Sequence, residues 1–503
     1  MKKLNPPSAG TREYFLQTPL STILEEHAST NIEERQLALF QRCVQQVPAY
    51  RRFLAAQRIN PAEIRTFRQF QSLPLLDKVN YMQAYPLPER CFNGSLLGAD
   101  RVAVSSGSTG LSTFWPRSAA DEAAVALRFE QVFADSFQAH ERSTLAVVCF
   151  ALGNWVGGMF TTSCCWQLAA KGYPLMVATP GNQPAEIFRV VREMAPHFQQ
   201  TVLLGYPPFI KDVIDAGRAS GIDWSAYQMK LVFAGEVFSE EWRELLGKRT
   251  GSKSTYFDSA SLYGTADAGV LGNETPFSIA IRRWLASQPM AARQLFGESR
   301  LPTLVQYDPV SRFFEVHEDT LVISADCSVP LLRYHIADKG GLLTYAQMWR
   351  FLQENGVQSL LDLGLPVDFQ PRELPFVYVF GRADFTVSYY GANIYPENIS
   401  VGLEQVPICN QVSGKFVLET LETSEGDKYL QIAVELLADI EAGAELSERV
   451  GLAVLEQLRR LNSEFTHYVP PDKQLPTIKL CSFGDAQYFP VGVKHRYTRN
   501  KQS

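Results

Sequence analysis

The chain has 503 residues, which is longer than one ordinary domain and predicts at least two. Hydrophobic residues make up 46% and charged residues 20%, the balance of a globular protein with enough apolar material for a core. The net charge of −6 argues against nucleic acid as the main partner, and we expect none.

The cysteines and the apolar stretches bear on the location of the protein. The eight cysteines are scattered and include no C-x-x-C pair, so we expect reduced thiols in a cytoplasmic protein. The first residues carry charge without an apolar run behind it, so we expect no signal peptide. Residues 143–170 lack charge, but glycine and polar residues interrupt them, whereas a spanning helix needs about 20 mainly apolar residues. We expect a buried strand over residues 145–150, a glycine-rich turn and a packed helix there, and no membrane span.

The first 100 residues are expected to be helical and irregular, with a helical pattern over residues 36–57 that breaks at Val47 and Pro48. Between residues 101 and 380, short β-rich runs alternate with amphipathic stretches. Predicted strands include residues 145–150, 174–178, 201–204 and 230–234. This alternation predicts an α/β fold, with layered, largely parallel sheets and helices.

A second unit is expected to begin near Arg382. Residues 412–418, 428–436 and 476–483 are predicted strands, and residues 442–461 form a predicted amphipathic helix. We therefore divide the chain into a large domain, residues 1–383, and a small mobile α+β domain, residues 384–503.

The first segment with chemical potential is an apolar strand that runs into a loop rich in serine and glycine. The loop consists of Ser105, Ser106, Gly107, Ser108, Thr109 and Gly110. It offers closely spaced backbone N–H groups and hydroxyls, and glycine lets the backbone approach an anion. The loop therefore indicates phosphate binding, although a flexible turn has the same composition. It is not a Walker loop, because G-x-x-x-x-G-K-[ST] is absent.

Two further segments carry a carboxylate near a turn or a strand end. Tyr263 and Gly264 form a predicted turn shortly before Asp267. The tyrosine ring there can lie against a planar base and the carboxylate can hold Mg²⁺, unless the segment is a loop with a solvated aspartate. Asp338 follows an apolar strand and precedes two glycines, so we expect it at the strand end. A carboxylate in that place can accept both hydroxyls of a ribose.

The last two segments lie near the predicted domain boundary and near the chain end. Arg382 and Asp384 fall at the boundary, where an arginine that reaches a nucleotide and a hinge would both be useful. A polar linker between domains is the plainer interpretation. Lys494 lies in a short basic tail and by itself has the features of a surface lysine.

The five segments occur in one order, and together they resemble the adenylate-forming superfamily of acyl-CoA ligases, luciferases and peptide-synthetase adenylation domains. Within that superfamily, the chain resembles the phenylacetate–CoA ligase branch. The similarity includes the Ser/Gly loop, the Leu-Arg-Tyr strand that leads to Asp338, and the run Gly-Ala-Asn-Ile-Tyr-Pro that starts at Gly391. It extends from about residue 36 to the C-terminus. Asp267 is one methylene shorter than the usual glutamate, so it is expected to bind Mg²⁺ through water.

The resemblance implies an enzyme that uses ATP, Mg²⁺ and coenzyme A to activate a small-molecule carboxylic acid that is aromatic or bulky and apolar. It also implies a set of roles: Lys494 and Asp267 as catalytic residues, the latter as a Mg²⁺ ligand; residues 105–110 on the β- and γ-phosphates; Tyr263 and Gly264 beside adenine; Asp338 and Arg382 on the ribose; Asp384 as the hinge; and Gly391 beside the pantetheine arm of CoA.

The acid pocket and the acceptor are less constrained by the sequence. Aromatic side chains at predicted strand ends or turns are candidates for the pocket, although such residues are more often core: Phe150, Trp155, Tyr206 and Phe233. The alternative acceptor is an amine or the thiol of a separate carrier protein, and a catalytically silent binding protein is a third hypothesis. A serine hydrolase is disfavoured because no G-x-S-x-G elbow occurs.

Overall fold

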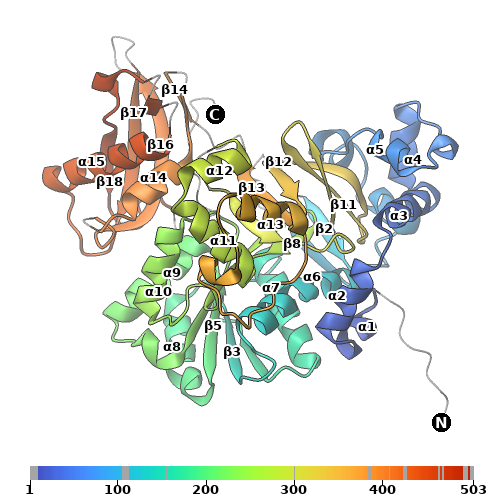
Figure 1. Cartoon of the computed structure of the whole chain (residues 1–503), viewed down its shortest axis with the longest axis horizontal. Helices are drawn as coiled ribbons and strands as arrows, with labels where there is room; N and C mark the ends of the chain where they lie inside the picture. The colour runs from blue at the N-terminus through green and yellow to red at the C-terminus, as the bar shows by residue number, and fades with distance from the viewer. Residues whose placement is uncertain are drawn as a thin grey trace.

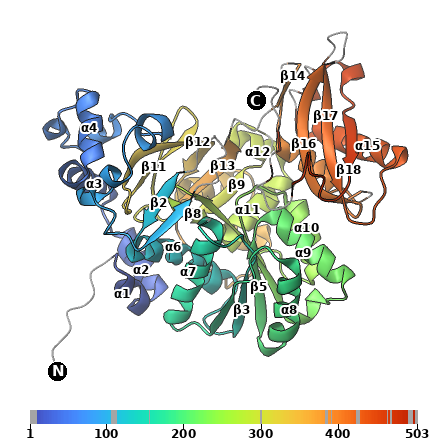
Figure 2. The ribbon, with the colours of Figure 1, turned by 180° about the vertical axis from the view of Figure 1, so that it is seen from behind.

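The computed structural model describes residues 10–104, 113–154, 156–298, 301–382, 387–390, 392–406, 408–422, 428–462, 465–466, 469–490, 495 and 497–498. We call the described residues up to 382 the large unit and those from 387 onward the small unit. Figure 1 shows the small unit packed against one side of the large unit, and Figure 2 shows the same arrangement from behind.

The chain opens with short helices on the side of the large unit away from the small unit (Figure 1). They are α1 (Arg12–Gln17), α2 (Leu20–Ala28), α3 (Ile32–Gln46), α4 (Pro48–Ala56) and α5 (Phe67–Gln71). The predicted break at Val47 is confirmed, because Pro48 lacks an N–H and therefore opens α4 as its first residue.

The large unit is built around one sheet of eleven strands in the order β10-β11-β12-β13-β9-β8-β7-β6-β5-β3-β4. Its strands are β3 (Thr144–Val148), β4 (Leu175–Ala178), β5 (Gln200–Gly205), β6 (Met229–Ala234), β7 (Ser259–Thr265), β8 (Gly269–Asn273), β9 (Thr303–Gln306), β10 (Phe313–His317), β11 (Thr320–Ala325), β12 (Leu331–Leu343) and β13 (Phe376–Arg382). A separate hairpin joins β1 (Arg101–Val104) to β2 (Phe114–Arg117). The four strands predicted over residues 145–234 are thus confirmed as β3 to β6.

The sheet is parallel in one half only. Parallel pairs join β4, β3, β5, β6 and β7. Antiparallel pairs join β7 to β8 and continue through β9, β13, β12 and β11 to β10. The expected α/β fold is confirmed, but the expectation of a largely parallel sheet holds only for the half whose strands alternate with helices. Apolar runs predict a buried strand without fixing its direction.

Helices cover both faces of the parallel half. In β3, Leu145 and Val147 face one core cluster with α8 (Pro184–Met194), α9 (Pro207–Ala219) and α10 (Glu240–Thr250). Ala146 faces the other cluster, with α6 (Ala119–Gln131) and α7 (Val156–Ala170). Burial of both faces explains why these strands are continuously apolar. The predicted strand and packed helix of residues 143–170 are β3 and α7. Among the described residues, no helix combines the length and the apolar character that a membrane crossing requires.

A third cluster of the large unit surrounds the antiparallel strands β9 and β13. It is formed with α11 (Pro276–Ala286), α12 (Pro289–Phe296) and α13 (Tyr345–Glu354).

The small unit has a hydrophobic cluster of its own, composed of residues from Val387 onward. Its elements are β14 (Val387–Tyr389), β15 (Ala392–Ile394), α14 (Pro396–Leu403), β16 (Val412–Glu422), β17 (Lys428–Leu436), α15 (Ala444–Leu461) and β18 (Thr477–Cys481). β16 and β17 pair antiparallel, and β17 and β18 pair in parallel. The predicted strands and helix of this unit are confirmed, whereas the proposed boundary after residue 383 falls outside the described residues.

Candidate functional site

The predicted site residues of the large unit gather at the carboxyl edge of the parallel strands. Phe150 follows β3, Tyr206 follows β5, and Tyr263 lies near the end of β7. The chain passes from β3 to its neighbour β4 and then to β5 on the other side of β3. In open α/β sheets, ligands bind outside the carboxyl ends of the strands at such a reversal of direction. The topology therefore marks this edge as the candidate site.

The segment with Tyr263 and Asp267 forms a hairpin of β7 and β8. Tyr263 and Gly264 lie inside β7, so the prediction that they form a turn is wrong; the turn consists of residues 266–268 and carries Asp267. The register shifts between Tyr263 and Gly264. A shift of this kind re-aims a side chain, and such irregularities are common beside active sites.

Asp338 and Tyr263 meet across the site, although they are 75 residues apart in the sequence. The hydroxyl of Tyr263 donates a hydrogen bond of 2.7 Å to Asp338 Oδ2. Arg382, the last residue of β13, lies opposite Asp338 in the pairing of β12 with β13. The structure therefore brings the predicted adenine residue and the two predicted ribose residues into one place.

Asp338 lies inside β12, so the prediction that it occupies a strand end is wrong. The strand continues to Leu343 because glycines 340 and 341 fit against Tyr378, where a Cβ would lie 2.2 Å or 2.3 Å from an oxygen atom of that residue. The pairing is nevertheless irregular here, with register shifts on both sides of β12. Ala337, next to Asp338, has φ +60°. A non-glycine residue in that region costs roughly 1–3 kcal/mol, and strain of this kind clusters at functional sites.

Asp267 is buried, with 6% of its surface exposed, and its carboxylate is held by a neighbour. The Tyr334 hydroxyl donates to Asp267 Oδ2 over 2.8 Å. No group of three or more His, Cys, Asp or Glu that would suit a metal occurs among the described residues. Mg²⁺ commonly keeps several waters and is held by one or two carboxylates together with substrate phosphates. Asp267 fits that mode of binding and does not form part of a metal cage made by the protein alone.

The aromatic candidates for the acid pocket have different environments. Phe150 is partly buried and lies against Gly157 of α7, where a Cβ would be 3.2 Å from its ring. The Tyr206 hydroxyl is buried and has no hydrogen-bond partner in the described part of the chain. Phe233 is fully buried, with ring centroids 5.0 Å from Phe238 and 5.1 Å from Trp242. Phe233 therefore contributes to the core on the α10 side. Of the three candidates that the structure describes, Tyr206 is the one with a buried polar group that lacks a hydrogen bond.

Several predicted site residues lie outside the described residues: Ser105, Ser106, Gly107, Ser108, Thr109, Gly110, Trp155, Asp384, Gly391 and Lys494. The side chain of Arg382 is not described either. Strands β1 and β2, which flank the predicted phosphate loop, pair from Arg101 with Arg117 to Val104 with Phe114.

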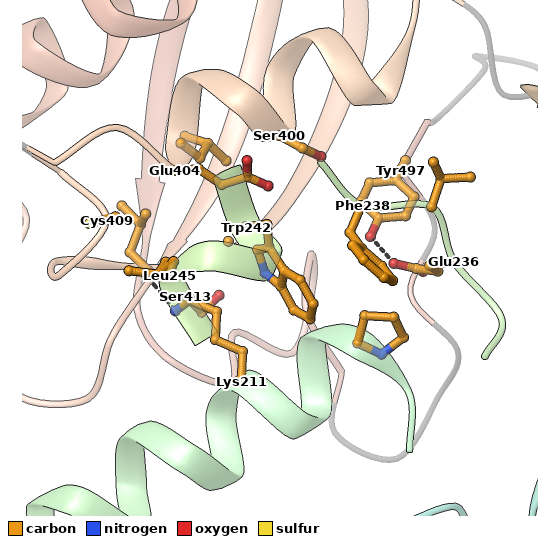
Figure 3. A pocket seen from close by; sticks show the side chains of 15 residues that line it. Lys211, Glu236, Phe238, Trp242, Leu245, Ser400, Glu404, Cys409, Ser413 and Tyr497 are labelled. Atoms are coloured by element: carbon orange, nitrogen blue, oxygen red, sulfur yellow. Dashed lines mark hydrogen bonds between the residues drawn. The ribbon is translucent and has the colours of Figure 1, made fainter. Parts of the chain in front are cut away.

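The two units meet along α9, α10 and the loop that precedes α10. Lys415 pairs with Asp212 over 2.7 Å. Other contacts join Arg249 to Asn410, Ser239 to Glu404, and Tyr497 to Glu236. Figure 3 shows residues that line the small cavity at this interface: Lys211 and Trp242 come from the large unit, and Glu404 and Ser413 from the small unit. Its volume of about 40 Å³ holds a few water molecules and is too small for a nucleotide.

Glu404 stands out in this interface because burial raises the pKa of its carboxyl to about 8. The Ser239 hydroxyl and the cations Arg282 and Lys211 act in the opposite direction, and Glu241 adds to the rise. Burial therefore favours the protonated form of this carboxyl in this arrangement of the units.

Sequence reasoning missed three residues that hold the Asp267 turn, namely Arg117, Arg312 and Tyr334. Tyr334 lies within the Leu-Arg-Tyr run that carried part of the resemblance. One signal for Arg117 was present in the sequence: it is the last residue of the short strand that follows the Ser/Gly loop.

Comparisons with known proteins identify the fold. No family model and no curated protein matches the sequence. The structure is similar to 2-hydroxyisobutyryl-CoA ligase in the postadenylation state with 2-HIB-AMP, at 15% identity and a TM-score of 0.64, over 99% of this chain and 94% of that ligase. It is also similar to the same ligase with 2-HIB-AMP and CoA in the thioesterification state, at 16% identity and a TM-score of 0.52, over 100% and 94%.

The higher of the two scores belongs to the structure in the postadenylation state. At this level of identity the similarity shows a shared fold. The chain has the fold of an adenylate-forming acyl-CoA ligase.

Proposed function

We propose that the chain is an ATP-dependent ligase that converts an aromatic or bulky apolar carboxylic acid to an acyl-adenylate and then to its coenzyme A thioester. The observation that carries the proposal is the meeting of Tyr263, Asp338 and Arg382 beside Asp267 at the carboxyl edge of the sheet. These residues come from three separated segments, and each is the one that the resemblance assigns to the nucleotide or its metal.

In the first half-reaction, a carboxylate oxygen of the acid attacks the α-phosphorus of ATP and pyrophosphate leaves. Two anions must approach each other, so preorganised positive charge lowers the barrier. We assign this role to Lys494, with residues 105–110 on the leaving phosphates. Asp338 accepts the ribose hydroxyls, and its hydrogen bond from Tyr263 fixes the carboxylate in place.

Mg²⁺, when bound, neutralises charge on the phosphates. Asp267 would hold it, directly or through water, and Tyr334 orients the carboxylate by donating to Oδ2.

The acid is proposed to enter between the ends of β3 and β5, beside Phe150 and Tyr206. The Tyr206 hydroxyl has no hydrogen-bond partner among the described residues. This supports the location, because a buried polar group without a hydrogen bond is costly and a ligand oxygen would satisfy it. The preference for an aromatic acid follows from the resemblance to the phenylacetate–CoA ligase branch.

In the second half-reaction, the thiol of CoA attacks the acyl carbon and AMP leaves. We propose that the small unit turns about Asp384 for this step, which withdraws Lys494 and brings Gly391 to the pantetheine arm.

The decisive experiment is a screen of aryl and alkyl acids with ATP and Mg²⁺, read as exchange of labelled pyrophosphate into ATP. Acids that exchange are then incubated with CoA, and the products are identified by mass spectrometry. An aryl acid should give exchange and a thioester with release of AMP. Efficient exchange with free amino acids alone would contradict the proposed acid, and an adenylate that never consumes CoA would favour an amine or a carrier-protein thiol as the acceptor. Absence of exchange with every acid would favour a silent binding protein.

A further inference from the structure

The turn that carries Asp267 is held by two arginines from distant parts of the chain. Arg117 Nη2 donates to the carbonyl oxygens of Ala266, at 2.9 Å, and Asp267, at 2.7 Å. Arg312 donates to the carbonyl oxygen of Ala268 through Nε, at 2.9 Å, and through Nη2, at 2.7 Å. All three carbonyls of the turn at residues 266–268 are therefore bound by a guanidinium group.

Both arginines are buried and packed, and Arg117 Nη1 has no hydrogen-bond partner in the described part of the chain. Each has 3% of its surface exposed. Arg117 lies over the rings of Trp115, at 5.8 Å, and Phe160, at 5.7 Å, while Arg312 Nη1 donates to its neighbour Ser311 over 2.7 Å. Charge-assisted hydrogen bonds from buried, immobilised donors are among the stronger ones in proteins. The turn is thus attached to a rigid support on its main-chain side, while Tyr334 holds its carboxylate.

Other features of the hairpin leave the turn little freedom. Thr265 accepts a hydrogen bond of 3.2 Å from the N–H of Ala268 through its hydroxyl. Gly269 has φ +75°, and a Cβ there would lie 2.8 Å from Val125. These contacts restrict the conformation of the main chain at the turn. The arginines therefore determine the position of the Asp267 backbone, from which its side chain extends.

We propose that Arg117 and Arg312 are positioning residues that set the location of the Asp267 carboxylate for Mg²⁺. This inference rests on the proposed function for the metal role of Asp267. Arg117 also ends β2, the strand that leaves the predicted phosphate loop, so its contact with the turn fixes the hairpin of β1 and β2 relative to Asp267 across 150 residues of sequence. Two parts of the proposed ATP site are thereby tied together by one side chain.

Two variants of similar size distinguish the contribution of the Arg117 hydrogen bonds from that of its packing. Arg117→Lys keeps a charged donor, whereas Arg117→Met fills similar space without one. Arg282→Met and Arg282→Lys are controls for the loss of a buried arginine away from the turn, because Arg282 is buried, donates to the main-chain carbonyls of Pro302 and Phe238, and also pairs with Glu240.

The first measurement is amide hydrogen exchange of the peptide that covers residues 260–272, which needs neither substrate nor activity. Arg117→Met should speed exchange of the turn amides by at least about tenfold, and Arg117→Lys should do so less, because removing a charged hydrogen-bond partner exposes the turn to opening. Equal exchange in the Met and Lys variants, or equal acceleration by the Arg282 variants, would overturn the proposal. If Arg117→Met does not fold, the comparison of Arg117→Lys and Arg312→Lys with Arg282→Lys decides.

The second measurement is the binding of Mn²⁺, as a spectroscopic substitute for Mg²⁺, in the presence of a non-hydrolysable ATP analogue. In the wild-type background, Arg117→Met should raise the Kd for Mn²⁺ about tenfold. In the Asp267→Asn background, Arg117→Met should leave that Kd unchanged, because Arg117 acts through the Asp267 carboxylate. Equal effects in both backgrounds would mean that Arg117 does not act through Asp267. Absence of Mn²⁺ binding by the wild-type chain would instead refute the metal role of Asp267, and the hydrogen-exchange comparison would still decide whether the arginines hold the turn.

Discussion

Glu404 follows α14, accepts a hydrogen bond from the Ser239 hydroxyl of the large unit, and has a pKa raised to about 8 by burial. Once the units separate, water would surround the carboxyl and its pKa would return to the ordinary value of 4.5. Between pH 4.5 and about 8, Glu404 therefore carries a proton when the units are docked and has lost it when they are separated. The contribution of Glu404 to docking should be full below pH 4.5 and should be lost as the pH rises to about 8.

The magnitude follows from linkage. A full difference of one bound proton changes the docking free energy by about 1.4 kcal/mol per pH unit, which is tenfold in the equilibrium. The upper limit between pH 6 and 8 is thus about 100-fold. Because Glu404 is partly exposed and faces Lys211 and Arg282, we expect roughly tenfold. Glu404→Gln stays neutral at every pH and should remove the dependence.

Energy transfer between dyes on the two units measures this equilibrium. All eight cysteines are buried, so cysteines introduced at the exposed positions Met290 and Leu452 would be labelled selectively. Wild-type transfer should change between pH 6 and 8, and that of Glu404→Gln should not. Glu448→Gln, which changes an exposed acid of the small unit, should behave as wild type. A pH response in Glu404→Gln equal to that of the wild type would refute the reasoning.

Four further predictions concern the proposed reaction. Lys494→Ala should lower the rate of pyrophosphate exchange by at least about 10²–10³ and spare thioester formation from a pre-made adenylate; exchange at the wild-type rate would show that the assignment is wrong. Asp267→Asn should raise the Mg²⁺ concentration for half-maximal exchange, and an unchanged titration would exclude the metal role. Tyr206→Phe should raise KM for the acid about tenfold and leave KM for ATP unchanged; no change in either would remove Tyr206 from the pocket. Gly391→Leu and Asp384→Pro should keep exchange and lose thioester formation, so retained thioester formation would count against the hinge.

Much of the architecture could be predicted because local physics determines it. The break at Val47 follows from the missing N–H of Pro48. The predicted strand over residues 428–436 matches β17, whose sequence is rich in strand-forming residues such as Tyr429, Ile432 and Val434. The alternation of β-rich runs with amphipathic stretches was enough to predict the α/β fold that the comparisons confirm. A motif indicates whether a residue lies on a strand or in a loop, and that assignment needs no tertiary information.

Strand direction and the surroundings of the site depended on tertiary structure. The apolar pattern of β13 is compatible with either direction, and its antiparallel pairing with β12 places Arg382 opposite Asp338. No local rule connects Arg117 with a turn 150 residues away. The amino-acid sequence by itself determined which groups are present and which elements carry them. Tertiary structure decided which groups touch, because contacts between distant segments depend on the packing of whole layers and not on the propensity of any one segment.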